Sequence, residues 1–149
     1  MNAFVDEQGR YAKRAEIYRT EYAEVRDIPF YLSFIAEGRT RVLEIPCGAG
    51  RLTSALAMKA KHVIAIDIEP RMIESLREHV DTLGLGGKVT AHVGDMTTFA
   101  LEETVDLIIV PSEAIQLLET ADAKRALACM VANLRPGGFI VLDLATFVE

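Results

Sequence analysis

Two glycines in a short loop are the strongest chemical signal in this sequence. Gly48 and Gly50 lie in the segment 44–51, Glu-Ile-Pro-Cys-Gly-Ala-Gly-Arg, between an apolar run and a helical pattern. Because glycine has no side chain, such a loop lets the backbone approach a ligand closely at the start of a helix. Asp67 ends the next apolar run, where a carboxylate can accept both hydroxyls of a ribose. Together these residues predict a site for a nucleoside-bearing cofactor.

The residue three positions after the second glycine bears on which nucleotide binds. A dinucleotide-binding loop favours glycine or alanine there, because the helix packs closely on the strand beneath a pyrophosphate. This chain has Thr53, whose branched side chain fits that packing poorly. The pattern therefore disfavours NAD and flavins, and a nicotinamide-dependent dehydrogenase is the weaker alternative.

Short apolar runs that alternate with helical patterns must position this loop. They predict five strands, at 41–46, 62–67, 88–93, 105–110 and 139–144, the last after a Pro-Gly-Gly turn at 136–138. Several runs are apolar on both faces, as expected for parallel strands covered by helices on both sides. We therefore expect an α/β fold with a doubly wound, mostly parallel sheet, in which ligands bind beyond the carboxyl ends of the strands.

The residues before the first predicted strand favour helices. Apolar and aromatic residues recur at helical spacing between Gly9 and Val25, and Pro29 then starts a second short helix that extends to Ala36. No Pro-, Gly- or Ser-rich linker interrupts the 149 residues, a length that fits one domain. We predict a single domain over 1–149, with an N-terminal helical cap over 1–38 and a Rossmann-like core over 39–149.

Composition excludes several classes of protein. A net charge of −6 argues against a general polyanion-binding surface, so nucleic acid is not favoured as a partner. The start of the chain has no basic region followed by an apolar stretch, and no apolar run is long enough to span a membrane. Cys47 and Cys129 lie in apolar segments, and the three histidines lack ligand spacing, which predicts reduced thiols and no metal. We therefore expect a cytoplasmic protein without a membrane partner.

Five segments, in order, resemble the class I S-adenosylmethionine-dependent methyltransferases, and the resemblance covers the chain from about Asp27 to its end. The segments are 42–53, 63–67 with 70–73, 94–96, 105–111 and 134–138. The resemblance implies a Rossmann-like methyltransferase fold with N-terminal helices and S-adenosyl-L-methionine as the cofactor. It also implies methyl transfer to an oxygen, nitrogen or carbon nucleophile, and the acidic balance of the chain favours a small-molecule substrate.

The same resemblance implies a set of cofactor-binding residues at the carboxyl ends of the first four predicted strands. They are Glu44, Cys47, Gly48, Ala49, Gly50, Asp67, Ile68, Asp95, Met96 and Val110. The backbone of 47–50 would lie along the methionine part and Asp67 would hold the ribose. Asp95 would accept from the adenine amino group, with Ile68 and Met96 beside the base. Glu44 and the Val110 carbonyl would face the methionine ammonium. No catalytic residue is implied.

Six further residues are weaker candidates. Four tyrosines belong to the predicted N-terminal helices, which cover the cleft in the resembling family, and core packing is the alternative role for them: Tyr11, Tyr18, Tyr22 and Tyr31. Glu113 and Gln116 follow the fourth predicted strand on the expected reaction side, and ordinary surface positions are the alternative for both.

Two features depart from the family pattern. Pro46 stands where many members have glycine, and proline has no N–H to donate. The family sheet also continues past its fifth strand, whereas this sequence ends at Glu149, so a truncated sheet is expected. The apolar strand 139–144 would then form an exposed edge that a homo-oligomer or a partner chain would cover. A non-catalytic or partner-completed cofactor-binding subunit is therefore the alternative to an enzyme.

Overall fold

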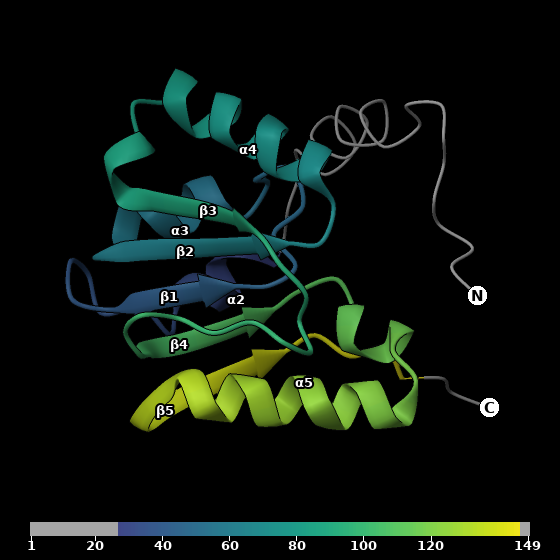
Figure 1. The fold of residues 1–149 in the computed structure, drawn as a ribbon. Coiled ribbons are helices and arrows are strands. Elements are labelled where there is room, and N and C mark those ends of the chain that lie inside the picture. The colour runs from purple at the N-terminus through teal and green to yellow at the C-terminus, as the bar shows by residue number, and fades with distance from the viewer. Residues whose placement is uncertain (1–26, 147–149) are drawn as a thin grey trace.

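A parallel β-sheet forms the centre of the fold. The structure is a computed structural model that describes residues 27–146, and the predicted helix at 9–25 lies outside them. The five strands pair in the order β3-β2-β1-β4-β5, every pair parallel (Figure 1). They are β1 (Arg41–Glu44), β2 (His62–Asp67), β3 (Val89–Val93), β4 (Val105–Val110) and β5 (Leu134–Leu142). The predicted doubly wound parallel sheet is confirmed.

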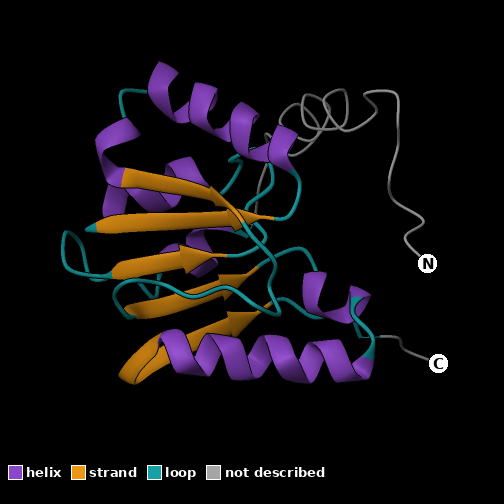
Figure 2. Cartoon of the chain, viewed as in Figure 1, coloured by secondary structure: helices purple, strands orange, loops and turns teal. Residues whose placement is uncertain are grey.

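Helices cover both faces of the sheet (Figure 2). The α-helices are α2 (Ile28–Leu32), α3 (Thr53–Lys59), α4 (Pro70–Thr82) and α5 (Thr120–Asn133), with 3₁₀ turns η1 (Gly86–Lys88) and η2 (Ala114–Leu117). Buried residues of α2, α3 and α4 pack on one face, here called the α3 face, and α5 packs on the opposite α5 face. None of these helices is long and apolar enough to cross a membrane.

Alternation along the first strand assigns its side chains to these two faces. Val42 packs in the core on the α3 face, whereas Leu43 and Ile45 pack in the core on the α5 face. Successive side chains of a strand point to opposite sides, so Glu44 points to the α3 face with Val42. A carboxylate is thereby buried at the carboxyl end of the central strand, directly before the glycine loop.

The helix predicted to run from Pro29 to Ala36 ends earlier, at Leu32. Side-chain hydroxyls instead form hydrogen bonds with backbone groups in and just after this helix. The Ser33 hydroxyl donates to the Phe30 carbonyl at 2.5 Å, and the Ala36 N–H donates to the Thr40 hydroxyl at 2.8 Å. Such local hydrogen bonds compete with helix continuation.

The start and end of the last strand also differ from the prediction. β5 begins at Leu134, which pairs with Val105, and ends at Leu142. The predicted turn at 136–138 is instead an irregularity within the strand, between the pairs Val105–Leu134 and Leu107–Phe139. A Cβ on Gly138 would lie only 2.8 Å from the Asp106 carbonyl oxygen, so glycine allows this close approach. The third strand likewise begins at Val89 rather than at residue 88.

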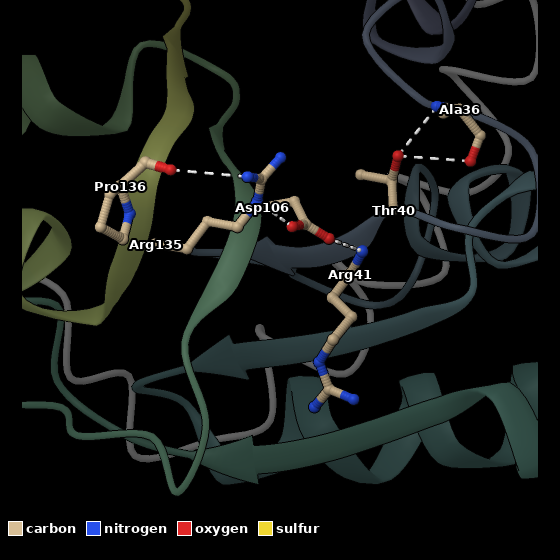
Figure 3. A network of polar contacts seen from close by, with 6 residues as sticks. All are labelled: Ala36, Thr40, Arg41, Asp106, Arg135 and Pro136. Atoms are coloured by element: carbon tan, nitrogen blue, oxygen red, sulfur yellow. Dashed lines mark hydrogen bonds and ion pairs between the residues drawn. The ribbon is translucent and has the colours of Figure 1, made fainter.

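Charged residues tie the strands together at their amino ends. Asp106 of β4 accepts a hydrogen bond from the Arg41 N–H at 2.7 Å and forms an ion pair with Arg135 of β5 (Figure 3). The Arg41 guanidinium pairs with Glu103 at 3.0 Å. Because ligands of such sheets bind at the opposite edge, this network is structural.

Candidate functional site

The glycine loop connects the carboxyl end of β1 to α3. Gly48 and Gly50 have φ angles of +55° and +96°, in the left-handed region that favours glycine. A Cβ on Gly50 would lie 3.2 Å from the Leu76 side chain of α4, whereas a Cβ on Gly48 would meet no atom within 4 Å. Gly50 therefore allows the loop to pack against α4, whereas the backbone at Gly48 has open space beside it.

Asp67 lies against this loop. One oxygen of its carboxylate accepts the Gly48 N–H at 2.8 Å, and the other accepts the Glu69 N–H at 3.0 Å. The residue is 7% exposed, and burial raises the pKa of the carboxyl above its ordinary value. Each carboxylate oxygen can accept a further hydrogen bond. The structure thus brings Asp67 and Gly48 together at the tips of neighbouring strands.

The backbone amides of the loop differ in how they are bonded. The Cys47 N–H donates to the Ile66 carbonyl at 2.9 Å, and the Gly50 N–H donates to the Cys47 carbonyl at 3.4 Å. The Gly48 N–H is bonded to Asp67, as described above. Among residues 47–50, Ala49 alone has an N–H without a partner in the described part of the chain. That N–H is the loop donor left for a ligand.

Glu44 is buried at the end of β1, with 1% of its surface exposed. The Thr53 hydroxyl, in the first turn of α3, donates to its carboxylate at 2.5 Å. Burial raises the pKa of Glu44 to about 8 despite this hydrogen bond. In the sequence, Thr53 indicates only that a dinucleotide is disfavoured, and its contact with Glu44 was not predicted.

Replacing Thr53 by valine is expected to lower the free energy of unfolding by about 1–3 kcal/mol, because Glu44 would lose this hydrogen bond while buried. Valine keeps the branched shape. Thr53→Ser, which keeps the hydroxyl, is the control and should recover most of the loss in urea titrations. A native stability for Thr53→Val, or a loss in Thr53→Ser as large as that in Thr53→Val, would contradict a stabilising role for the hydroxyl.

A second contact that the sequence does not predict joins the loop to the segment before α2. The Arg51 guanidinium donates two hydrogen bonds to the Asp27 carboxylate, each 2.9 Å long. This pairing lowers the pKa of Asp27. Asp27 and Arg51 are 24 positions apart, so no local sequence pattern indicates this pair.

The predicted adenine-side residues follow β2 and β3. One carboxylate oxygen of Asp95 accepts the Thr97 N–H at 2.8 Å and the Thr97 hydroxyl at 2.7 Å, and these bonds lower its pKa. Ile68 is 67% exposed, whereas Met96 is partly buried against the core of the α5 face. Asp95 therefore caps a turn, and its predicted contact with adenine stays a prediction.

Two other predicted site residues are buried. Burial raises the pKa of the Cys47 thiol, which makes it a poor nucleophile. The Val110 carbonyl already accepts the Asp143 N–H at 3.1 Å, although a carbonyl can accept a second bond. Its contact with an ammonium likewise stays a prediction.

A hollow of about 620 Å³ lies along β2 and β3, on the face opposite α3. His62, Ile64, Thr90, His92 and Phe99 are among its lining residues, and none of the predicted cofactor-binding residues is. Within residues 27–146, no group of three His, Cys, Asp or Glu residues is arranged to hold a metal ion.

A protein-family model and a set of curated proteins match this chain. The family model described as "Methyltransferase domain" matches residues 42–138. The carboxy-S-adenosyl-L-methionine synthase of Klebsiella pneumoniae (strain 342) is 28% identical over 132 residues, which cover 79% of this chain and 53% of that protein. The chain therefore spans about half the length of the curated relatives it matches.

Solved structures share the fold. A S-adenosylmethionine-dependent methyltransferase from Clostridium acetobutylicum ATCC 824 superposes with a TM-score of 0.76 at 23% identity, covering 90% of this chain and 57% of the other. CalS10, an amino pentose methyltransferase from Micromonospora echinaspora solved with S-adenosylmethionine bound, has a TM-score of 0.66 at 27% identity. That match covers 99% of this chain and 60% of CalS10.

Proposed function

This chain belongs to the methyltransferase domain family, and from that premise we propose that it binds S-adenosyl-L-methionine and transfers its methyl group to a small-molecule nucleophile. The observation that carries the proposal is the hydrogen bond of 2.8 Å between Asp67 and Gly48. It joins the acidic tip of β2 to the glycine loop after β1, which is where a nucleoside cofactor binds in parallel α/β sheets.

The residues at this edge fit such a cofactor. Gly48 leaves open space beside the backbone, and the Ala49 N–H is a free donor for the amino-acid part. Asp67 keeps acceptor capacity for two ribose hydroxyls beyond the N–H groups it already binds. Glu44 provides a buried carboxyl group that an ammonium would complement once its proton is released.

Methyl transfer from S-adenosyl-L-methionine mainly requires that the protein position the cofactor and the nucleophile. S-adenosyl-L-methionine supplies an activated methyl group: the nucleophile's lone pair forms the new bond to the methyl carbon, the carbon–sulfur pair passes to sulfur, and S-adenosylhomocysteine leaves. The loop and Asp67 would orient the adenosine, beside the buried Glu44. Alignment of this kind contributes up to about 7–11 kcal/mol in well-oriented systems. No side chain in the described part of the chain identifies itself as a general base.

Calorimetry with S-adenosylhomocysteine and with NAD tests the cofactor. We expect S-adenosylhomocysteine to bind and NAD to give no measurable heat, because the loop carries Thr53 rather than a small residue. NAD binding without binding of the thioether would contradict the proposal.

Carboxy-S-adenosyl-L-methionine synthesis is a second candidate, favoured by the 28% identity to synthases of that name. The two candidates differ in the nucleoside that the protein retains. Mass spectrometry of the ligand released from the purified, denatured protein distinguishes S-adenosylmethionine or S-adenosylhomocysteine from the carboxylated compound.

A partner-completed assembly is the further proposal for the edge of the sheet. β5 is the last strand of the described sheet, and Phe139 on it is 63% exposed. Exposed apolar edges favour association, so gel filtration is expected to give a dimer or larger assembly. A monomer that stays soluble at high concentration would contradict this expectation. The net charge of −6 supports action on small molecules rather than on nucleic acid. A cytoplasmic location is proposed separately, from the sequence patterns described above.

A further inference from the structure

A second carboxylate lies at the carboxyl edge of the sheet, outside the cofactor loop. Asp143 directly follows β5, and its N–H donates to the Val110 carbonyl of β4 at 3.1 Å. This bond extends the pairing of β4 and β5 by one residue. The backbone of Asp143 is therefore fixed at the tip of the sheet, beside the loop that follows β4.

The side chain of Asp143 points to the same face as the N-terminal helix α2. Val141, two residues earlier, packs in the core of the α3 face together with Tyr31 of α2. Because alternate residues share a face, Asp143 points toward this side as well. After burial itself, the charge of Asp143 is the largest cause that raises the pKa of Tyr31, which reaches about 12. The Asp143 side chain therefore lies on the face of the sheet that Tyr31 covers.

Both polar groups lack partners. Tyr31 is 2% exposed, yet within residues 27–146 its hydroxyl makes no hydrogen bond, and the Asp143 carboxylate makes no hydrogen bond or ion pair. Among the described residues, the Tyr31 hydroxyl is not one of the buried side-chain atoms that lack a partner, so this unbonded hydroxyl reaches the surface. Tyr31 therefore offers a free donor and Asp143 a free anionic acceptor on the same face of the sheet.

Other contacts hold this arrangement in place. The side-chain amide of Gln116, in η2, donates to the Ala145 carbonyl at 3.0 Å and accepts the Ala145 N–H at 2.6 Å. The loop that leads to η2 contains Ser112 and Glu113 at φ angles of 59° and 56°, which non-glycine residues seldom adopt. Gln116 therefore fixes the segment after β5 against the loop after β4, and Asp143 lies within that fixed segment.

The charge around Tyr31 is unbalanced. Asp27, Asp143 and Glu44 all raise the pKa of the Tyr31 hydroxyl, whereas Arg51 lowers it. Arg51 is paired with Asp27 through two hydrogen bonds, so it compensates that carboxylate. Asp143 is left without a cation among the described residues. A protonated amine complements such a site, because hydrogen bonds between charged partners are stronger than neutral ones.

We propose that Asp143 and the Tyr31 hydroxyl form the methyl-acceptor subsite and that this subsite takes an amine. The inference rests on the proposed function, since it assumes a bound S-adenosyl donor at the neighbouring loop. Asp143 is the specificity-determining residue, and Gln116 is a positioning residue that acts through the backbone of Ala145.

Sinefungin tests the subsite without knowledge of the acceptor. In this analogue of S-adenosylmethionine, a carbon that bears an amino group replaces the sulfur and its methyl group, so the amine lies where donor and acceptor meet. We expect the native protein to bind sinefungin more tightly than S-adenosylhomocysteine. Asp143→Asn is expected to reduce that affinity ratio about tenfold or more, the size of a lost charge-assisted hydrogen bond.

Two further variants make the test decisive. Tyr31→Phe keeps the buried ring, removes only the hydroxyl, and should also lower the ratio. Asp81→Asn, an exposed aspartate at the far end of α4, is the control and should leave the ratio unchanged. If S-adenosylhomocysteine binds while Asp143→Asn and Tyr31→Phe both keep the native ratio, the amine subsite is refuted and the cofactor proposal stands. If the native protein binds neither ligand, the proposed function itself fails.

Discussion

The free energy of unfolding is expected to fall by about 1.4 kcal/mol per pH unit between roughly pH 4.5 and 8 because of Glu44 alone. Burial raises the pKa of this acid from 4.5 to about 8, so in this window the folded chain keeps a proton that the unfolded chain has released. The stabilising contribution is complete below pH 4.5 and is lost as the pH rises through 8. It amounts to about 5 kcal/mol at most.

Glu44→Gln isolates this effect. Glutamine has the same shape and can still accept from the Thr53 hydroxyl, but it does not titrate. Urea unfolding across the pH series should therefore give a flatter profile for Glu44→Gln than for the native chain. Glu102→Gln, at an exposed position, is the matched control and should keep the native slope. Identical pH slopes for Glu44→Gln and the native chain would mean that Glu44 does not hold a proton in the fold.

Asp67→Ala is expected to weaken S-adenosylhomocysteine binding by about 1–3 kcal/mol, because two ribose hydroxyls would lose their acceptor. The loss corresponds to a factor of about 5 to 150 in Kd. The variant also leaves the N–H groups of Gly48 and Glu69 without a carboxylate, so the loop itself should loosen. Calorimetry well below the unfolding temperature of the variant measures the affinity.

Asp81→Ala serves as the control for this experiment, since Asp81 is exposed in the last turn of α4 and is not one of the predicted cofactor-binding residues. Its affinity for S-adenosylhomocysteine should match that of the native chain. An unchanged affinity in Asp67→Ala would remove the assignment of Asp67 to the ribose.

The sequence predicted β2 and β4 well because burial on both faces leaves a continuous apolar run, whereas β1, predicted over 41–46, ends at Glu44. β2 and β4 have the predicted bounds, 62–67 and 105–110. β5 was placed incorrectly because its start depends on Leu134 pairing with the distant Val105, which no local pattern encodes. The early end of α2 likewise depends on Thr40, which accepts from the Ala36 N–H across a turn.

The candidate site was predictable only in part, because some of its contacts also depend on packing that no local sequence pattern encodes. Strand order alone places Asp67 beside Gly48, because carboxyl ends of adjacent parallel strands meet at one edge. The hydrogen bond from Thr53 to Glu44 depends on how α3 packs on β1. Thr53 did carry a signal, since a polar branched residue at a buried helix start calls for a nearby acceptor. The sequence alone could not name that acceptor.

Contacts between segments far apart in the chain were not predictable at all. Gln116 was recognised as a residue on the reaction side, with a surface position as the alternative. Its two hydrogen bonds to Ala145 became visible only once the tips of β4 and β5 were brought together. The proposed amine subsite depends on this proximity, and so no spacing rule could have indicated it.

The most direct test of the account is a crystal structure of the protein with S-adenosylhomocysteine. We predict that both ribose hydroxyls lie within hydrogen-bond distance of the Asp67 carboxylate and that the Ala49 N–H faces the homocysteine part. Adenosine bound instead in the hollow along β2 and β3, with Asp67 bonded only to Gly48 and Glu69, would contradict the account.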